Sequence, residues 1–136
     1  MEIRAFNEKD TPEVIALWTE VFGYEAPHND PATVIGKKLA VQRELFFVAH
    51  EDGRIVGTVM GGYDGHRGWI YSMAVAPQFR RQGIGRKLVQ HLERALADLG
   101  CLKINLQVLA GNAAVTAFYE RLGYKVEPRI SMGKIL

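Results

Sequence analysis

Glycine and arginine residues come together in a short segment that could hold a phosphate anion. Residues 80–86 read Arg-Arg-Gln-Gly-Ile-Gly-Arg, and the apolar residues after them recur at helical spacing. The first turn of a helix carries unpaired N–H groups and a partial positive charge. Gly83 and Gly85 would let an anion approach the backbone closely, and the flanking arginines add positive charge. The segment therefore predicts a pyrophosphate cradle.

Two familiar phosphate motifs do not match this segment. A P-loop ends in Gly-Lys followed by Ser or Thr, whereas this loop ends in Gly85-Arg86-Lys87. A dinucleotide-binding loop needs a third glycine, where this chain has Leu88. It also needs an acidic residue at the end of the next strand, where Val108 and Leu109 stand. Both interpretations are therefore disfavoured, and the loop alone does not identify its anion.

The elements around the loop must place it at the edge of a sheet. Residues 69–75 predict a strand that Pro77 ends, residues 84–99 an amphipathic helix, and residues 102–109 a second strand. A helical crossover of this kind favours parallel pairing of the two strands. Residues 45–75 predict an antiparallel meander with a hairpin turn at Asp52-Gly53. The other expected elements are a strand at residues 3–6, helices near 10–23, 32–41 and 112–121, and final strands at 124–126 and 130–135.

Two motifs resemble those of the GNAT superfamily of N-acetyltransferases. Arg80-x-x-Gly83-x-Gly85, which follows a strand ending in Val75-Ala76-Pro77, is similar to the acyl-CoA signature of that superfamily. Residues 112–124 (NAAVTAFYERLGY) resemble its second motif, and the two motifs stand in the same order and spacing. The expected element order matches the family fold over essentially the whole chain. Residues 57–68 further resemble the bacterial YpeA-like branch, which fixes no acceptor.

This resemblance implies a fold and an activity. The fold would be of the α/β class, in one domain spanning residues 1–136. Its central twisted mixed sheet would have six to seven strands flanked by about four helices. Splayed parallel strands would bind the acyl-CoA. The implied enzyme moves an acetyl group from acetyl-CoA to a primary amine by direct attack in a ternary complex.

The resemblance also implies roles for individual residues. The backbone of residues 73–75 would pair with the pantetheine arm, and the amides of residues 81–86 would bind the phosphates. The Asn112 position often bonds the pantetheine arm, although this residue can equally cap its helix. The complete set of expected donor-binding residues is Met73, Ala74, Val75, Arg80, Arg81, Gln82, Gly83, Ile84, Gly85, Arg86 and Asn112. No metal ligands are expected.

Tyr119 is the expected catalytic residue, because its position in the family often lies near the thioester sulfur. An alkyl thiol titrates near ~8.5 and a tyrosine near ~10, so a phenol could protonate the departing sulfur. Tyr119 could instead be a core aromatic residue beside Phe118. The N–H groups of Met73 or Val75 could polarise the thioester carbonyl.

The general base stays open. The family often has a glutamate on the strand at residues 70–73, and this chain has none there. An acidic pocket formed by Glu25, Asp30 and Asp64 would favour a cationic acceptor. The full set of candidates is Glu25, His28, Asp30, Glu44, Asp64, His66, Tyr71 and a water molecule.

Composition narrows the class of protein. The chain has 136 residues, a hydrophobic fraction of 48% and a net charge of +2, which suits a globular domain without the basic excess of a nucleic-acid binder. Cys101 is the single cysteine, so no internal disulfide can form. Burial beside an apolar strand makes Cys101 a poor nucleophile. The charged N-terminus argues against a signal peptide, and we expect a cytoplasmic protein.

Three functions remain to be weighed. The first is acetylation of a small-molecule or peptide amine, with no nucleic acid or membrane as partner. The second is a non-catalytic module that binds or senses acyl-CoA. A nucleic-acid binder using residues 80–87 is disfavoured, because no stacking aromatics are interleaved with the charges. A homodimer formed through residues 130–135 is an open expectation.

Overall fold

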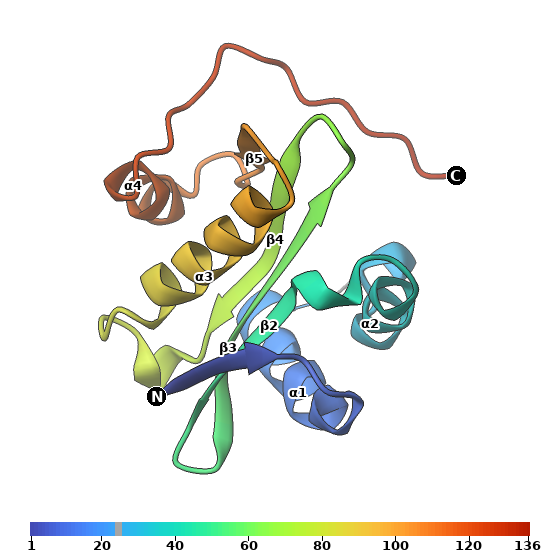
Figure 1. The fold of residues 1–136 in the computed structure, drawn as a ribbon, viewed down its shortest axis with the longest axis vertical. Helices are drawn as coiled ribbons and strands as arrows, with labels where there is room; N and C mark the ends of the chain where they lie inside the picture. The colour runs from blue at the N-terminus through green and yellow to red at the C-terminus, as the bar shows by residue number, and fades with distance from the viewer. Residues whose placement is uncertain (24–25) are drawn as a thin grey trace.

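A five-stranded sheet carries helices on both of its faces (Figure 1). The computed structural model describes residues 1–23 and 26–136. The strands are β1 (Glu2–Ala5), β2 (Phe46–Glu51), β3 (Arg54–Tyr63), β4 (Gly68–Val75) and β5 (Ile104–Leu106). The helices are α1 (Thr11–Phe22), α2 (Pro31–Ala40), α3 (Ile84–Asp98) and α4 (Ala113–Arg121). Short 3-10 turns are η1 (Glu8–Asp10), η2 (Pro27–Asn29), η3 (Arg43–Leu45) and η4 (Pro77–Phe79).

Strand order follows the chain, β1-β2-β3-β4-β5. The first four strands pair antiparallel, and β5 pairs parallel to β4 after the α3 crossover. The predicted meander and the predicted parallel crossover are therefore both confirmed. This mixed sheet puts the loop that precedes α3 at the end of β4.

The predicted strand number was wrong, because the described residues form five strands rather than six to seven. Residues 124–126 and 130–135 form no strand. Side chains hold this C-terminal segment to β5 in place of a backbone ladder. Lys103 contacts Glu127 at 2.5 Å, Asn105 donates to Glu127 at 2.8 Å, and Gln107 donates to the Ser131 hydroxyl. Pro128, which has no N–H to donate, interrupts the segment between them.

The predicted strand at residues 102–109 was also too long, since β5 spans only Ile104–Leu106. Leu102 is 97% exposed and Leu109 is 84% exposed, so these apolar residues do not continue a buried strand. The shortness of β5 matters for the site, because most of β4 runs on beyond it.

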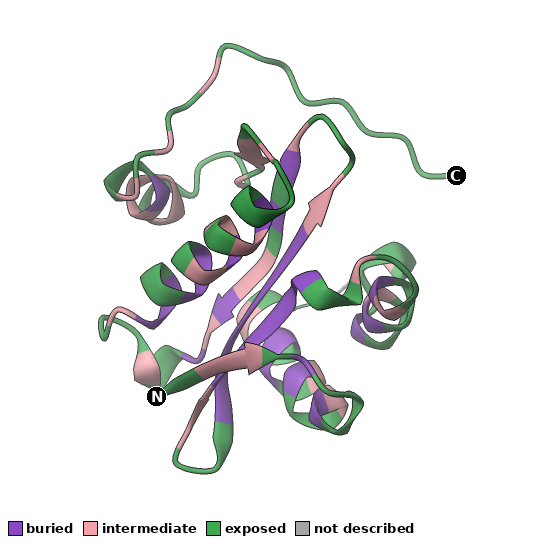
Figure 2. Ribbon diagram, viewed as in Figure 1, coloured by how far each residue is buried: buried purple, intermediate pink, exposed green. Residues whose placement is uncertain are grey.

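The core has one layer on each face of the sheet (Figure 2). On one face α3 buries its predicted stripe of Ile84, Leu88, Leu92 and Leu96 against the sheet, whereas Leu99 at its end is exposed. On the other face α1 and α2 cover the sheet with Val14, Leu17, Trp18 and Ile35. No helix in the described parts of the chain is long and apolar enough to cross a membrane.

Candidate active site

Strands β4 and β5 separate soon after they begin to pair. The parallel ladder joins Gly68 to Ile104, Trp69 to Asn105 and Ile70 to Leu106. Beyond Ile70, β4 continues to Val75 with no strand partner on that side among the described residues. Its unpaired N–H and C=O groups can take an extended ligand as an additional strand, because backbone polar groups need partners. Met73 and Val75 direct backbone groups to this free edge, whereas Ala74 between them directs its own toward Thr58 of β3.

A β-bulge at Ser72 changes which face of the sheet the β4 side chains occupy. Ser72 has φ 51°, and two β4 residues, Ser72 and Met73, lie opposite Val59 of β3. Ile70 therefore packs into the α3 layer and Ala74 into the α1 layer, although both have even numbers. Without the bulge they would face the same way.

A buried hydrogen-bond relay holds this bulge. Trp18 Nε1 donates to the Thr58 hydroxyl at 2.8 Å, and that hydroxyl donates to the Ser72 carbonyl at 2.9 Å. Trp18 and Thr58 are both fully buried. Because a buried polar group without a partner is costly, the relay links the core under α1 to the backbone conformation of β4.

The glycine-arginine loop presents backbone amides at the end of β4. Gly83 is the N-cap of α3, has φ 79°, and supplies no side-chain cap. The Lys87 amide bonds the Gly83 carbonyl, which leaves the amides of Ile84, Gly85 and Arg86 as the unpaired first turn. Arg81 also has a left-handed φ of 65°. Consecutive amides in such conformations form an anion-binding concavity.

The side chains of the loop have different roles. Arg80 Nε donates to the Val75 carbonyl at 3.2 Å, which ties the loop to the strand end. Arg81, Gln82 and Arg86 are exposed, and Ile84 is a core residue that can contribute only its backbone.

The structure gives a different reason for the glycine at position 85 than the sequence analysis did. A Cβ atom there would lie 3.2 Å from Phe118 Cζ, so the missing side chain allows α4 to approach α3 rather than admitting an anion. The amide of Gly85 remains part of the first turn of α3. Gly83, in contrast, has open space around its missing Cβ, where only an Arg86 nitrogen lies within 4 Å, at 3.9 Å.

Asn112 and Tyr119 lie at the start and in the body of α4. Asn112 Oδ1 accepts from the Val115 amide at 3.3 Å, so this residue caps the helix. Tyr119 is 7% exposed and packs edge-on against Phe118 and Tyr124. It lines a cavity of about 1050 Å³ between β5, α4 and the C-terminal segment.

Burial raises the pKa of Tyr119 to about 12. The phenol therefore stays protonated at physiological pH and can donate a hydrogen bond. Full proton transfer to a thiolate that titrates near ~8.5 would be unfavourable from this state. The environment thus suits a hydrogen-bond donor to a developing thiolate better than the proton donor expected from an unperturbed tyrosine.

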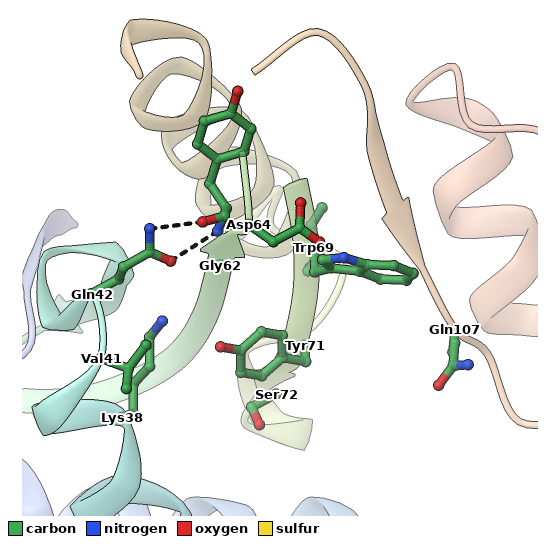
Figure 3. A pocket seen from close by; sticks show the side chains of 11 residues that line it. Lys38, Val41, Gln42, Gly62, Asp64, Trp69, Tyr71, Ser72 and Gln107 are labelled. Carbon is green, nitrogen blue, oxygen red and sulfur yellow. Dashed lines mark hydrogen bonds between the residues drawn. The ribbon is translucent and has the colours of Figure 1, made fainter. Parts of the chain in front are cut away.

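A second cavity, which we call the Lys38 cavity, lies over the outward face of β4 (Figure 3). Its volume is about 840 Å³. Trp69 and Gln107 line both this cavity and the Tyr119 cavity, so the two meet where β4 and β5 separate. The residues that line it are Lys38, Val41, Gln42, Gly62, Tyr63, Asp64, Trp69, Ile70, Tyr71, Ser72 and Gln107.

Two of the predicted base candidates line the Lys38 cavity, Asp64 and Tyr71. Asp64 Oδ1 accepts the amides of His66 at 2.8 Å and Arg67 at 2.7 Å, and these bonds lower the pKa of Asp64. Burial raises the pKa of Tyr71. Asp64 is therefore ionised and Tyr71 neutral at physiological pH.

The remaining candidates lie elsewhere. Asp30 caps α2 by accepting the Thr33 amide and hydroxyl, each at 3.0 Å. His28, Glu44 and His66 are exposed and do not line the cavity. Glu25 lies outside the described residues. Of the two described members of the predicted acidic pocket, Asp64 lines the cavity and Asp30 does not.

Lys38 and Gln42 were not predicted as site residues. Lys38 is 5% exposed and donates to the Gly61 carbonyl, and burial lowers its pKa while Glu44 opposes that shift. The Gln42 side chain donates to the Tyr63 carbonyl at 2.9 Å and accepts the Tyr63 amide at 2.8 Å. It thus pairs with the end of β3, although Gln42 itself precedes β2. Helical spacing could have indicated Lys38, since it shares the buried stripe of α2 with Pro31 and Ile35.

Cys101 does not belong to this site. It is partly buried, and its thiol donates to the Lys103 carbonyl at 3.3 Å. No group of three or more His, Cys, Asp or Glu side chains in the described ranges is arranged to hold a metal ion.

Known proteins are similar to this chain in sequence and in fold. An acetyltransferase of Yersinia enterocolitica is 47% identical over 136 residues, which cover 100% of this chain and 96% of that protein. The ribosomal-protein-S18-alanine N-acetyltransferase of Escherichia coli is 26% identical with a TM-score of 0.76, covering 90% of this chain and 76% of that one. The PaiA N-acetyltransferase of Thermoplasma acidophilum, solved in complex with coenzyme A, is 20% identical with a TM-score of 0.81, covering 95% and 92%.

The sequence profile of the acetyltransferase (GNAT) family matches residues 11–124, which is most of the chain. The match includes the free edge of β4, the glycine-arginine loop and α4. With the Yersinia enterocolitica relative similar along its full length, the predicted membership is confirmed: this chain belongs to the GNAT family of acetyltransferases.

Proposed function

We propose that the protein transfers an acetyl group from acetyl-CoA to a primary amine, by direct attack while both substrates are bound. The observation that carries this proposal is the free edge of β4, which leads into the uncapped N-terminus of α3. Family membership supports acyl transfer, and the PaiA relative bound to coenzyme A supports the choice of donor. The resemblance to the YpeA-like branch stays a prediction.

The residues of this chain suit an acyl-CoA. The amides of residues 83–86 and the charges of Arg81 and Arg86 would hold the pyrophosphate. The free backbone of Met73 and the N–H of Val75 would pair with the amide groups of the pantetheine arm, because the Val75 carbonyl already accepts from Arg80. Arg80 and Asn112 would act less directly, because Arg80 fastens the loop to Val75 and Asn112 caps α4.

Two groups of the protein would act on the thioester. When bound, acetyl-CoA supplies a thioester as the acyl donor. Backbone N–H groups near the bulge, at Met73 or Val75, would stabilise negative charge on the carbonyl oxygen. Tyr119 would donate a hydrogen bond to the departing sulfur.

The Lys38 cavity would orient the amine and receive its proton. Asp64 is the ionised carboxylate among its lining residues and would accept that proton through water. This assignment replaces the carboxylate that the strand at residues 70–73 lacks.

Binding of acetyl-CoA tests the donor site, with two variants at one position. Gly83→Asp places a carboxylate in the open space beside the loop, and Gly83→Asn has nearly the same shape without the charge. Asp and Asn both tolerate the left-handed conformation that Gly83 adopts, so charge alone distinguishes them. By calorimetric titration we expect Gly83→Asp to bind acetyl-CoA at least about tenfold more weakly than Gly83→Asn, from electrostatic repulsion.

Equal affinities in the two variants would place the phosphates elsewhere. Binding without acetylation in a broad amine screen would instead favour the second candidate function, a module that binds or senses acyl-CoA. Tyr119 is buried and protonated in a cavity that meets the Lys38 cavity, and this favours the enzyme over that module.

A further inference from the structure

We propose that the Lys38 cavity selects amine acceptors that carry a carboxylate, and that the Lys38 ammonium binds this carboxylate. The inference rests on the proposed acetyl transfer and adds the chemical class of the acceptor. A free amino acid, a peptide C-terminus or an acidic side chain could supply the carboxylate.

The first observation is that Lys38 is a buried cation that forms no ion pair with any of the described residues. The residue is 5% exposed, and the ion pairs of the described residues do not include it. Its observed contacts are a hydrogen bond to the Gly61 carbonyl and the ring of Tyr71, whose centroid lies 5.6 Å from Nζ. An ammonium group has three donors, and the Gly61 carbonyl occupies one of them.

The second observation is the direction in which the ammonium can find a further partner. Lys38 comes from α2, and the cavity lies between α2 and the outward face of β4 (Figure 3). The Tyr71 hydroxyl donates to the same Gly61 carbonyl at 3.4 Å, so this oxygen is already shared. Among the described residues Lys38 makes no other hydrogen bond, so its remaining donors are available to a ligand in the cavity.

Electrostatics indicates which hydrogen-bond acceptor would bind Lys38 best. A buried charge is stabilised when an opposite charge lies beside it, and a charge-assisted hydrogen bond is stronger than a neutral one. Burial lowers the pKa of Lys38, because no nearby negative charge fully stabilises the ammonium. The exposed Glu44 raises the pKa again only in part. A carboxylate in the cavity would supply the missing negative charge.

Asp64 does not fill this role. Its carboxylate is committed to the turn between β3 and β4 through the amides of His66 and Arg67. In Figure 3 it lies at the hairpin end of the cavity beside Trp69, whereas Lys38 lies across the ring of Tyr71. The cavity thus has a negative group at one end and a positive group at the other, which suits an acceptor with both an ammonium and a carboxylate.

Matched acceptor pairs test the inference. We would measure kcat/KM for α-, β- and γ-amino acids and for the corresponding carboxamides, on wild type and on Lys38→Met. The readout is the acid-to-amide ratio of one enzyme divided by that of the other, because this quotient cancels the different basicities of the two amines. We expect Lys38→Met to lower the ratio at least about tenfold, as for loss of one charge-assisted hydrogen bond.

Lys38→Arg is the control variant, since it keeps the positive charge and should keep most of the preference for acids. The source of the carboxylate is resolved with two dipeptides, one with a free C-terminus and neutral side chains, the other amidated with an acidic side chain. The dipeptide whose acetylation depends on Lys38 identifies the source.

Three outcomes would overturn the inference. Wild type could acetylate the amides as well as the acids at equal concentrations of free amine. Lys38→Met could lower both members of a pair equally, which would indicate a structural or proton-transfer role. Alternatively, both the amino acids and the dipeptides could be acetylated with no dependence on a carboxylate. Thermal unfolding shows whether Lys38→Met folds. If it does not, the acid-to-amide ratios of wild type and of Lys38→Arg still test the inference.

Failure of the inference is distinguishable from failure of the proposed function. If no amine of either kind is acetylated while acetyl-CoA binds, the proposed transfer fails and the carboxylate selection fails with it. If amines are acetylated without regard to a carboxylate, only the selection fails.

Discussion

The two sides of β4 are built in different ways. The proposed donor side consists of residues 71–75, the loop at residues 80–86 and Tyr119. It offers mainly backbone groups from one stretch of chain and one helix. The Lys38 cavity offers side chains that come from α2, the turn between β3 and β4, β4 itself and the segment after β5. The donor side therefore depends on local conformation, and the Lys38 cavity depends on the packing of distant elements.

This difference has a functional meaning. Backbone amides at a helix N-terminus bind phosphate whatever the surrounding side chains are, so the donor side can stay constant while the acceptor changes. The Lys38 cavity can change its preference through single side chains such as Lys38 and Asp64. The donor side and the Lys38 cavity meet at the bulge at Ser72, which we call the junction. The bulge directs Tyr71 toward the cavity and Met73 toward the other face of the sheet.

The largest effect is expected from Thr58→Val, which breaks the junction. Val has nearly the same shape as Thr but cannot accept from Trp18 Nε1 or donate to the Ser72 carbonyl. Each group left without a partner costs about 1–3 kcal/mol, so the loss of two partners should lower the free energy of unfolding by about 2–6 kcal/mol. Urea denaturation would measure this loss, and steady-state kinetics should show kcat reduced at least about tenfold.

Thr58→Ser is the matched control, because it keeps the hydroxyl and should retain most of the kcat. The affinity for acetyl-CoA should also fall in Thr58→Val, since the bulge at Ser72 leads directly into the Met73 backbone that would pair with the pantetheine arm. A stable Thr58→Val enzyme with unchanged kcat would show that the relay does not set the reactive geometry.

Much of the donor side could be predicted from the sequence. Glycine spacing before a helical stripe identifies the loop at residues 80–86, and the strand-helix-strand order predicts the parallel pairing of β4 and β5. Both depend on residues close together in the chain. The bulge at Ser72 could not be predicted, because its partner Thr58 lies on another strand and Ser72 fits an ordinary strand pattern.

The Lys38 cavity was largely beyond prediction for the same reason. Its lining runs from Lys38 to Gln107, and only the tertiary fold brings these residues together. Residues 130–135 were expected to form a final strand, but Ile130 and Met132 are each 91% exposed, and Ser131 instead accepts from the Gln107 side chain just after β5. Pattern alone cannot tell whether a partner strand is within reach.

An intermediate effect is expected from Tyr119→Phe, which tests the donor side alone. Loss of one hydrogen bond to the developing thiolate should reduce kcat about tenfold. The affinity for acetyl-CoA and the KM of the amine should stay nearly constant. Because burial raises the pKa of Tyr119 to about 12, the phenol remains protonated through the whole range from pH 6 to 10. Wild type and Tyr119→Phe should therefore show the same alkaline limb in a pH profile of kcat.

An alkaline limb near ~10 that disappears in Tyr119→Phe would contradict this expectation, since it would mean that an ordinary phenol titrates during catalysis. An unchanged kcat would assign Tyr119 to the core alone, where it contacts Phe118 and Tyr124.

The smallest effect is expected from Gln42→Asn, which tests the Lys38 cavity alone. Asn tolerates the left-handed φ of 53° at this position, but its shorter side chain cannot keep both bonds to the Tyr63 backbone. Because water can replace these partly exposed bonds, the loss should be about 1 kcal/mol. We expect the KM of the amine to rise about threefold. Neither kcat nor the affinity for acetyl-CoA should change, because Gln42 touches only the wall of the cavity. A change in acetyl-CoA affinity, measured by calorimetry, would show that the cavity and the donor side are coupled through β3 and are not independent.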